Sequence, residues 1–178
     1  MSTITIISGS PFTSSRLEGV LDLLSDALKE AGAKLNWIPV AAIPPEDLIY
    51  AKFNSPAIME ANQFIQNSDA VVVATPVYKA SYSGVLKTFL DLIPESGLEH
   101  KVTLPVAVGG TIAHLLAIEN SLKPVLSVLG ARYQMQGIFI CDTQVRRMET
   151  GGFIVDDEVK ARVLHSAKEL IQCMANRL

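Results

Sequence analysis

The sequence lacks the features that mark several common protein classes. Its 178 residues include only two cysteines, Cys141 and Cys173, and three histidines. Because the cysteines form no CxxC pair or metal-spaced cluster, we expect neither a disulfide scaffold nor a structural zinc site. Only 19% of the residues are charged, and the net charge is −3. So small a charge argues against a dedicated binder of nucleic acids or other polyanions.

Long apolar runs and targeting signals are also missing. The first residues, MSTITIISGS, carry no basic segment and reach polar residues after a few apolar ones, unlike a secretory signal. No uninterrupted apolar run approaches the roughly 18 residues of a membrane span. We therefore expect a soluble, cytoplasmic protein. With 49% hydrophobic residues and no repeat or long linker, residues 1–178 are expected to form a single domain with a full core.

Short β-branched runs alternate with longer helical stretches. The pattern predicts strands at Thr3–Ser8, Lys34–Val40, Ala70–Ala74, Val102–Val108 and Gly137–Cys141. It predicts helices at Leu17–Ala31, Pro56–Asn67, Ser83–Ile93, Ala113–Leu129 and Asp156–Arg177. This alternation favours a parallel sheet with helices on both faces. We expect an α/β, flavodoxin-like doubly wound sheet of order 2-1-3-4-5, which binds ligands beyond the carboxyl ends of its strands.

Two prolines conflict with these predicted elements. Pro105 lies inside the fourth predicted strand, where its missing N–H predicts a bulge or a strand boundary two residues later. Pro124 lies inside the fourth predicted helix and cannot donate to the carbonyl of Asn120. The helix is therefore expected to bend or widen near Asn120, either as a π-bulge or as an ordinary proline kink.

The loop after the first predicted strand, Ser8–Arg16, is rich in groups that bind phosphate. Its candidate phosphate ligands are Ser10, Thr13, Ser14, Ser15 and Arg16. Backbone N–H groups and the helix dipole favour an anion at a helix start, and a guanidinium can bind two phosphate oxygens. The loop matches neither GxxxxGK[ST] nor GxGxxG. A helix N-cap explains one hydroxyl but not the five in this loop, so phosphate binding is favoured.

The loop after the third predicted strand, Thr75–Gly84, lies at the same predicted edge of the sheet. It contains Pro76, Val77, Tyr78 and Lys79. Together with backbone amides, these residues can line one edge of a flat heterocycle. The alternative is a plain strand-to-helix turn, in which Ser81 or Ser83 caps the following helix. The loop alone does not decide between the two.

The loop after the fourth predicted strand begins with Gly109, Gly110 and Thr111. Paired glycines permit close approach of a ligand to the backbone, or simply a tight turn. His114, just beyond, is either a surface residue or a group near the predicted pocket. Three loops that converge on one edge are more informative than any one of them.

The predicted edge lacks acid–base machinery, and we assign no catalytic side chain. It shows no paired carboxylates, no GxSxG motif and no Cys–His pair at motif spacing. The acidic cluster of a magnesium-dependent phosphoacceptor is absent as well. A phosphate-binding loop with few acid–base groups suits a cofactor that performs the chemistry itself, and flavin is such a cofactor.

Four strings in the chain resemble the NADPH-dependent FMN reductases of the flavodoxin-like superfamily. They are Gly9-Ser10-Pro11, PEDLIYAKFNSPAI (Pro45–Ile58), VATPVYKASYSGVLKTFLDLIPE (Val73–Glu95) and LPVAVGGTIAHLLAIENSLKPVLSVLGA (Leu104–Ala131). The chain looks most similar to the flavin reductase component of two-component alkanesulfonate monooxygenase systems, because the PEDLIYA and GGTIAHLL strings are particular to that branch.

The resemblance implies a role for each loop. It assigns the FMN phosphate to Ser10, Ser15 and Arg16, the isoalloxazine to Pro76, Val77, Tyr78 and Lys79, and the far ring edge to Gly109, Gly110 and Thr111. Many members carry an arginine where this chain has Phe12. By this resemblance, Arg16 supplies most of the positive charge for the phosphate.

The resemblance also implies an activity. Hydride passes from NADPH or NADH to FMN, and FMNH2 goes to a flavin-dependent monooxygenase in sulfonate metabolism. A homodimer or homotetramer through Ala113–Leu129 is implied as well. Two alternatives stay open. One is a tight FMN flavoprotein that reduces quinones, azo dyes or metal oxyanions, and the other is a non-enzymatic, flavodoxin-like electron carrier.

Overall fold

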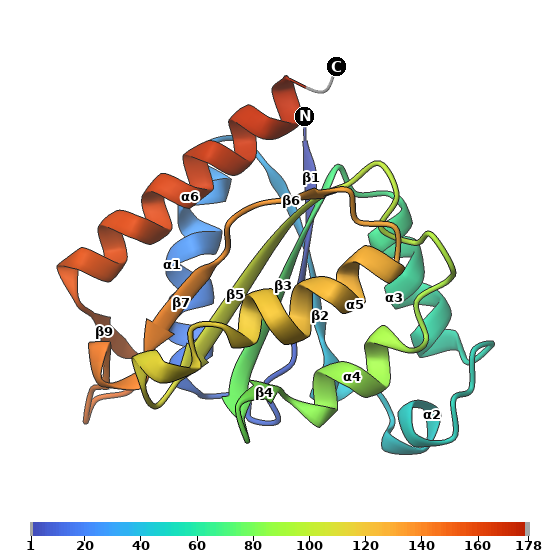
Figure 1. Ribbon diagram of the computed structural model, residues 1–178, viewed down its shortest axis with the longest axis horizontal. Helices are drawn as coiled ribbons and strands as arrows, with labels where there is room; N and C mark the ends of the chain where they lie inside the picture. The colour runs from blue at the N-terminus through green and yellow to red at the C-terminus, as the bar shows by residue number, and fades with distance from the viewer. Residues whose placement is uncertain (1, 177–178) are drawn as a thin grey trace.

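Residues 2–176 are described by the computed structural model, in which a sheet lies between two layers of helices (Figure 1). The strands are β1 (Thr3–Ser8), β2 (Lys34–Pro39), β3 (Ala70–Tyr78), β4 (Ser81–Tyr82), β5 (Val102–Gly109), β6 (Tyr133–Gln134), β7 (Ile138–Cys141), β8 (Val145–Arg147) and β9 (Phe153–Val155). The α-helices are α1 (Arg16–Glu30), α2 (Pro45–Ile49), α3 (Pro56–Gln66), α4 (Gly84–Leu90), α5 (Lys123–Val128) and α6 (Asp157–Ala175).

The sheet has the predicted topology. Its parallel strands run in the order β2-β1-β3-β5, and both β6 and β7 pair with the outer side of β5. Strand β4 pairs antiparallel with the end of β3 alone. When β4 is set aside and β6 and β7 are counted as one interrupted strand, the order is 2-1-3-4-5. The predicted flavodoxin-like fold is confirmed, and the topological switch point lies between β1 and β3.

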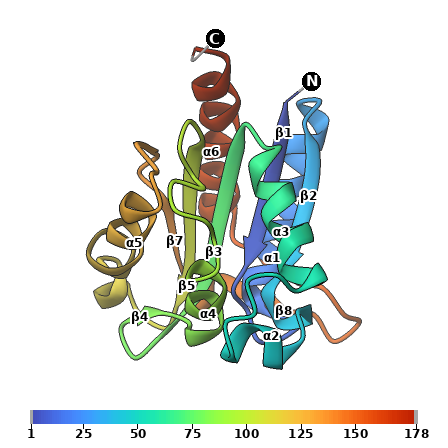
Figure 2. The ribbon, with the colours of Figure 1, turned by 90° about the vertical axis from the view of Figure 1, so that its right-hand side faces the viewer.

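The central strands are buried on both faces of the sheet. Helices α1 and α6 cover one face, and α3, α4 and α5 cover the other (Figures 1 and 2). Along β3, Val72 and Ala74 pack on the α1 and α6 side, whereas Val71 and Val73 pack on the opposite side. Successive side chains of a strand point to opposite faces, so a doubly covered strand is apolar at every position.

Pro105 affects the neighbouring strand and not its own. Strand β5 pairs with β3 without interruption, and Pro105 stands opposite Val73. On the other side of β5 the partner strand breaks between Gln134 and Ile138. Gly137 in this gap has a φ of +88° and faces the carbonyl of Pro105. The expected bulge in β5, or a strand boundary two residues after Pro105, is therefore wrong. The missing N–H is accommodated because the edge strand is split into β6 and β7.

The long helix predicted over Ala113–Leu129 is not continuous. A 3₁₀ turn spans Ile112–His114, a π-helical turn spans Ile118–Leu122, and only Lys123–Val128 is α-helical. Within this run the N–H of Lys123 donates to the carbonyl of Ile118, five residues earlier. Because Pro124 cannot donate to Asn120, the wider turn removes the need for that bond. Of the two expected solutions, the structure has the π-bulge.

Most other predicted boundaries differ from the observed ones by one to three residues. The main exception is β3, which continues past Ala74 to Tyr78. The closing helix was expected over Asp156–Arg177, and α6 ends at Ala175, while Arg177 lies outside the described residues. No helix among residues 2–176 is both long and apolar enough to cross a membrane.

A short antiparallel hairpin of β8 and β9 follows the sheet and packs on the start of α1. The contact depends on Gly19, because a Cβ there would lie 2.6 Å from Cβ of Phe153 in β9. Real Cβ atoms do not approach so closely. The glycine in the first turns of α1 is thus explained by the close approach of the hairpin.

Replacing Gly19 tests this packing. We expect Gly19→Ala to lower the free energy of unfolding by about 1–3 kcal/mol, because the core beside Phe153 becomes overpacked. The matched control is Gly84→Ala at the start of α4, where a Cβ meets no atom within 4 Å. That change is expected to be neutral or slightly stabilising. Urea denaturation measures both, and equal stability of the two variants would contradict the proposed close packing.

Candidate functional site

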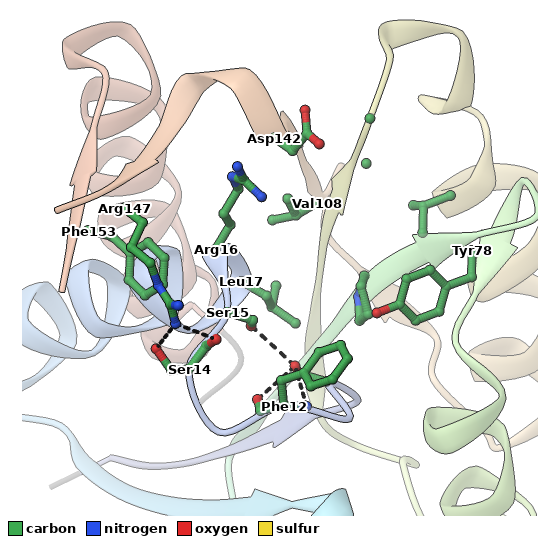
Figure 3. A pocket seen from close by; sticks show the side chains of 15 residues that line it. Phe12, Ser14, Ser15, Arg16, Leu17, Tyr78, Val108, Asp142, Arg147 and Phe153 are labelled. Atoms are coloured by element: carbon green, nitrogen blue, oxygen red, sulfur yellow. Dashed lines mark hydrogen bonds between the residues drawn. The ribbon is translucent and has the colours of Figure 1, made fainter. Parts of the chain in front are cut away.

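A cavity of about 380 Å³ lies at the carboxyl ends of the central strands (Figure 3). Its volume falls in the range of small-molecule sites, roughly 300–1,000 Å³. The lining residues come from the loop after β1, the end of β3, the end of β5 and the segment after β7: Ser10, Phe12, Ser14, Ser15, Arg16, Leu17, Pro76, Val77, Tyr78, Val108, Gly109, Gly110, Asp142, Arg147 and Phe153.

The cavity brings together most of the predicted site residues. Those that line it are Ser10, Ser14, Ser15, Arg16, Pro76, Val77, Tyr78, Gly109 and Gly110. Thr13 and Lys79 are exposed and do not line it. Thr111 is exposed too, and its hydroxyl accepts from the N–H of Ala113 as the cap of the 3₁₀ turn. His114 is half-buried and also lies outside the lining.

Hydroxyl groups hold the loop after β1 in shape. Ser15 is the N-cap of α1, and its Oγ accepts from the N–H of Glu18 at 3.3 Å. Ser10 is only 4% exposed. Its Oγ donates to the carbonyl of Phe12 and lies 3.2 Å from Oγ of Ser15. These serines therefore shape the loop as well as line the cavity, and the N-cap role of Ser15 is compatible with an anion in this cavity.

The backbone of this loop presents a row of unpaired donors. Within residues 2–176, the N–H groups of residues 13–17 donate to no protein acceptor. Helix starts leave such groups free, and they are satisfied by water, side chains or a ligand. Five consecutive donors at the positive end of a helix dipole fit an anion with several oxygens, such as a phosphate.

Two arginines connect this loop to the β8–β9 hairpin in opposite directions. Nε of Arg16 donates to the carbonyl of Val145 at 2.9 Å. Nη2 of Arg147 donates back to the carbonyl of Ser14 at 3.1 Å and to its hydroxyl (Figure 3). The Arg147 guanidinium also lies 5.6 Å from the ring centroid of Phe153. Arg147 is thereby held against the loop that carries the free N–H groups, and Arg16 is held against the hairpin.

One carboxylate, Asp142, lines the cavity. Within residues 2–176 it makes no ion pair with Arg16 or Arg147. The charges of the lining therefore sum to an excess of one positive charge, to which the helix dipole adds. This balance favours a negatively charged ligand.

The loop after β1 is fastened to the next loop of the cavity. Oγ of Ser83, the N-cap of α4, donates to the carbonyl of Gly9 at 2.6 Å. The N–H of Gly9 donates to the carbonyl of Ala74 at 2.8 Å. A Cβ on Gly9 would lie 2.6 Å from Cβ of Leu86. Of the two alternatives for the cap of α4, Ser81 and Ser83, the structure has Ser83, and the same hydroxyl fixes the spacing between the two loops.

The other half of the cavity is an apolar surface with space above the backbone. Pro76 and Val77 are half-buried, and Tyr78 is 46% exposed. The two predicted glycines differ. Gly109 is required by packing, because its Cβ would lie 2.9 Å from Cζ of Phe139. At Gly110 there is room for a side chain, because the atom nearest to an added Cβ is Oδ2 of Asp142 at 3.9 Å.

Several lining residues were not predicted: Phe12, Leu17, Val108, Asp142, Arg147 and Phe153. A signal for two of them was present in the sequence. The fifth predicted strand, Gly137–Cys141, ends at the same edge as the other strands. The rule applied to three loops therefore also covers the segment after it, which contains Asp142 and Arg147.

These residues can be compared with those of known proteins. A profile of the NADPH-dependent FMN reductases matches residues 2–145 of this chain. The chain belongs to the NADPH-dependent FMN reductase family. This confirms the resemblance drawn from the four sequence strings.

Individual relatives agree with this family. An FMN reductase (NADPH) from Pseudomonas putida is 46% identical over 146 residues, which cover 82% of this chain and 74% of the relative. An FMN reductase (NADPH) from Escherichia coli K12 is 47% identical over 142 residues, which cover 80% of this chain and 74% of the relative. The crystal structure of an NADH:FMN oxidoreductase (EMOB) in its apo form superposes with a TM-score of 0.83 at 32% identity, over 96% of this chain and 88% of that one.

The family profile ends at residue 145. It covers the loop after β1, the end of β3 and the end of β5. Arg147 and Phe153 lie beyond it, although both line the cavity.

A half-buried carboxyl group, that of Glu18, follows the donor row in the first turn of α1. Oγ of Ser8 donates to Oε1 of Glu18 at 2.6 Å. Burial raises the pKa of Glu18, the hydrogen bond from Ser8 partly opposes this, and the negative charge of Asp22 raises it further. The folded protein therefore keeps a proton on Glu18 to higher pH than the unfolded chain does, and the associated stability is lost as the pH rises above the ordinary carboxyl range.

The Glu18→Gln variant tests this pKa, because glutamine keeps an acceptor for Ser8 and does not titrate. We expect the free energy of unfolding of the wild type, minus that of the variant, to fall as the pH rises from about 4 to about 7. Urea denaturation at several pH values measures this difference, in which other titrating groups cancel. A difference that does not change with pH would contradict the raised pKa.

Proposed function

We propose that the protein is an NAD(P)H:FMN oxidoreductase that reduces FMN with NADPH and releases FMNH2. Family membership supports this. The observation that carries it is the row of free N–H groups at residues 13–17, which adjoins Arg16 and opens onto an apolar surface. A flavin mononucleotide has a charged phosphate at one end and a flat, largely apolar ring at the other. It therefore needs hydrogen-bond donors for an anion beside an apolar surface, and this cavity has both.

In this proposal the loop after β1 binds the phosphate. The N–H groups of residues 13–17 donate to its oxygens, and the free Nη groups of Arg16 add charge-assisted hydrogen bonds. Ser10 and Ser15 keep the loop in the required shape. Thr13 contributes its backbone N–H and not its side chain.

The end of β3 and the start of the loop after β5 orient the ring. Pro76, Val77 and Tyr78 line one side of the cavity, and Gly110 leaves the backbone uncovered. When bound, FMN supplies the redox chemistry by accepting a hydride from a reduced nicotinamide. The chain contributes alignment, since reacting atoms held about 3–3.5 Å apart react far faster than free ones. No acid–base side chain is required.

The physiological role proposed here is the supply of FMNH2 to a flavin-dependent monooxygenase, within alkanesulfonate use. Support comes from the PEDLIYA and GGTIAHLL strings, which resemble that branch of the family. Tyr78, which lines the cavity, is 46% exposed to solvent, which favours exchange of flavin over permanent retention.

We further propose a homodimer or homotetramer through the segment that contains the π-helical turn. Exposed apolar side chains on this segment support it: Ile112, Leu115, Leu116 and Val128. Such residues are costly to leave in water when they gather on one side of a molecule.

The proposed activity predicts a dependence on added flavin. We expect the purified protein to oxidise NADPH rapidly when FMN is added and only slowly without it, because the flavin exchanges with solution. Absorbance at the NADPH band measures the rate under anaerobic conditions, where reduced FMN accumulates. Rapid turnover without added flavin would instead favour a tight flavoprotein.

The proposed phosphate site predicts a selective effect of Arg16. We expect Arg16→Ala to weaken FMN binding by about 10- to 100-fold, the usual cost of a charge-assisted hydrogen bond. Riboflavin, which has no phosphate, serves as the internal control and should lose less than about twofold. Quenching of flavin fluorescence gives both dissociation constants, and equal losses for the two flavins would remove the phosphate role.

A further inference from the structure

The hairpin of β8 and β9 begins at Val145, where the match to the family profile ends, and two of its later residues line the cavity. It contributes one charged side chain, Arg147, and one aromatic side chain, Phe153. Figure 3 shows Arg147 directed at Ser14, on the side of the cavity that Arg16 also occupies. The position of Arg147 is therefore tied to the same loop that carries the free N–H groups.

Only part of the Arg147 guanidinium is used by the protein. Nη2 donates to the carbonyl and the hydroxyl of Ser14. Within residues 2–176, Nε and Nη1 donate to no acceptor, and no carboxylate forms an ion pair with the group. A guanidinium carries five N–H donors in a fixed plane, so three remain for a ligand.

The unused donors are held in place before any ligand arrives. The guanidinium lies over the ring of Phe153, and Phe153 packs against Gly19 in α1. Contacts at both ends, to Ser14 and to α1, fix the plane. Preorganisation of this kind lowers the ordering cost of binding.

The charge of a phosphate monoester matches two arginines better than one. Near neutral pH such a group carries about −1.5 to −2 charges. Arg16 alone leaves much of this charge uncompensated, and Asp142 adds a negative charge to the lining. With the second guanidinium the lining carries one net positive charge instead of none, which compensates about half or more of the charge of the phosphate.

We propose that Arg147 is a second phosphate-binding residue, which donates from Nε and Nη1 to the phosphate monoester of FMN and makes the site select FMN over riboflavin. This inference rests on the proposed function. It places the β8–β9 hairpin in the flavin site as a clamp on the phosphate.

The experiment compares flavin binding by variants of the full-length protein. Arg147→Ala removes the whole side chain, and Arg147→Gln keeps a polar side chain near Ser14 without the charge. The matched control is Arg146→Ala, which removes the same charge from the adjacent, exposed position on the opposite face of β8. Dissociation constants for FMN and riboflavin are measured by fluorescence quenching, and circular dichroism checks folding.

We expect both Arg147 variants to weaken FMN binding by about 10-fold or more and riboflavin binding by less than about twofold, with Arg146→Ala near wild type. The dependence of log Kd for FMN on log salt concentration should also become shallower in the Arg147 variants. A purely structural role would weaken both flavins equally, and that result would overturn the inference. So would an Arg147→Ala variant that binds FMN as well as Arg146→Ala does.

The phosphate monoester of NADPH is a second possible source of the same chemistry. Steady-state rates with NADPH and NADH at saturating FMN separate the two. We expect the ratio of their KM values to be unchanged by Arg147→Ala, and a selective rise for NADPH with unaltered FMN selectivity would overturn the inference.

Failure of the proposed function gives a different result. If the wild-type protein binds FMN no better than riboflavin, the phosphate site itself is wrong. A second result would refute only the role of Arg147. In that case the wild type binds FMN more tightly than riboflavin, Arg16→Ala loses this preference, and Arg147→Ala keeps it.

Discussion

The site depends on one constraint: the loop after β1 is held so that consecutive backbone N–H groups point away from any protein acceptor. The cap at Ser15 and the bond from Ser10 set its shape. The bond from Ser83 to Gly9 fixes it to the start of α4, and the bond from Gly9 to Ala74 fixes it to β3. Unpaired donors cost free energy when they are withdrawn from water. They are retained at the open end of the sheet, where solvent or a ligand satisfies them.

The strands and their order could be predicted because a doubly covered parallel strand leaves an unbroken apolar run, as at Ala70–Ala74. The segment after Thr111 could be predicted only in part: Pro124 indicated a widened or kinked turn near Asn120, but nothing indicated the 3₁₀ turn at Ile112–His114. Its apolar residues repeat as in a long helix, but Pro124 changes the hydrogen-bonding pattern upstream of itself. Pro105 was misplaced for a related reason. The strand that contains Pro105 is regular, and the pairing of the neighbouring strand is interrupted around Gly137. Such compensation between strands is a tertiary effect that local pattern does not contain.

Predicted site residues were those at the carboxyl ends of strands, where topology alone brings loops together. Nine of the twelve line the cavity, and the three that do not, Thr13, Lys79 and Thr111, stand at exposed turns. Arg147 and Phe153 were missed because their part in the cavity depends on how a hairpin folds back onto α1. The hairpin can pack this closely on α1 because residue 19 is a glycine, and no periodicity in the sequence indicates this contact.

The divided outer strand beside β5 has a consequence for how molecules meet one another. A long, regular strand at the border of a sheet offers its unpaired backbone groups to another chain and invites aggregation. Here that border consists of two pieces of two and four residues, with a turn between them at Gly137. Neither piece is long enough to template a continuous ladder. The divided border strand is therefore a poorer template for edge-to-edge pairing with another sheet than one continuous strand.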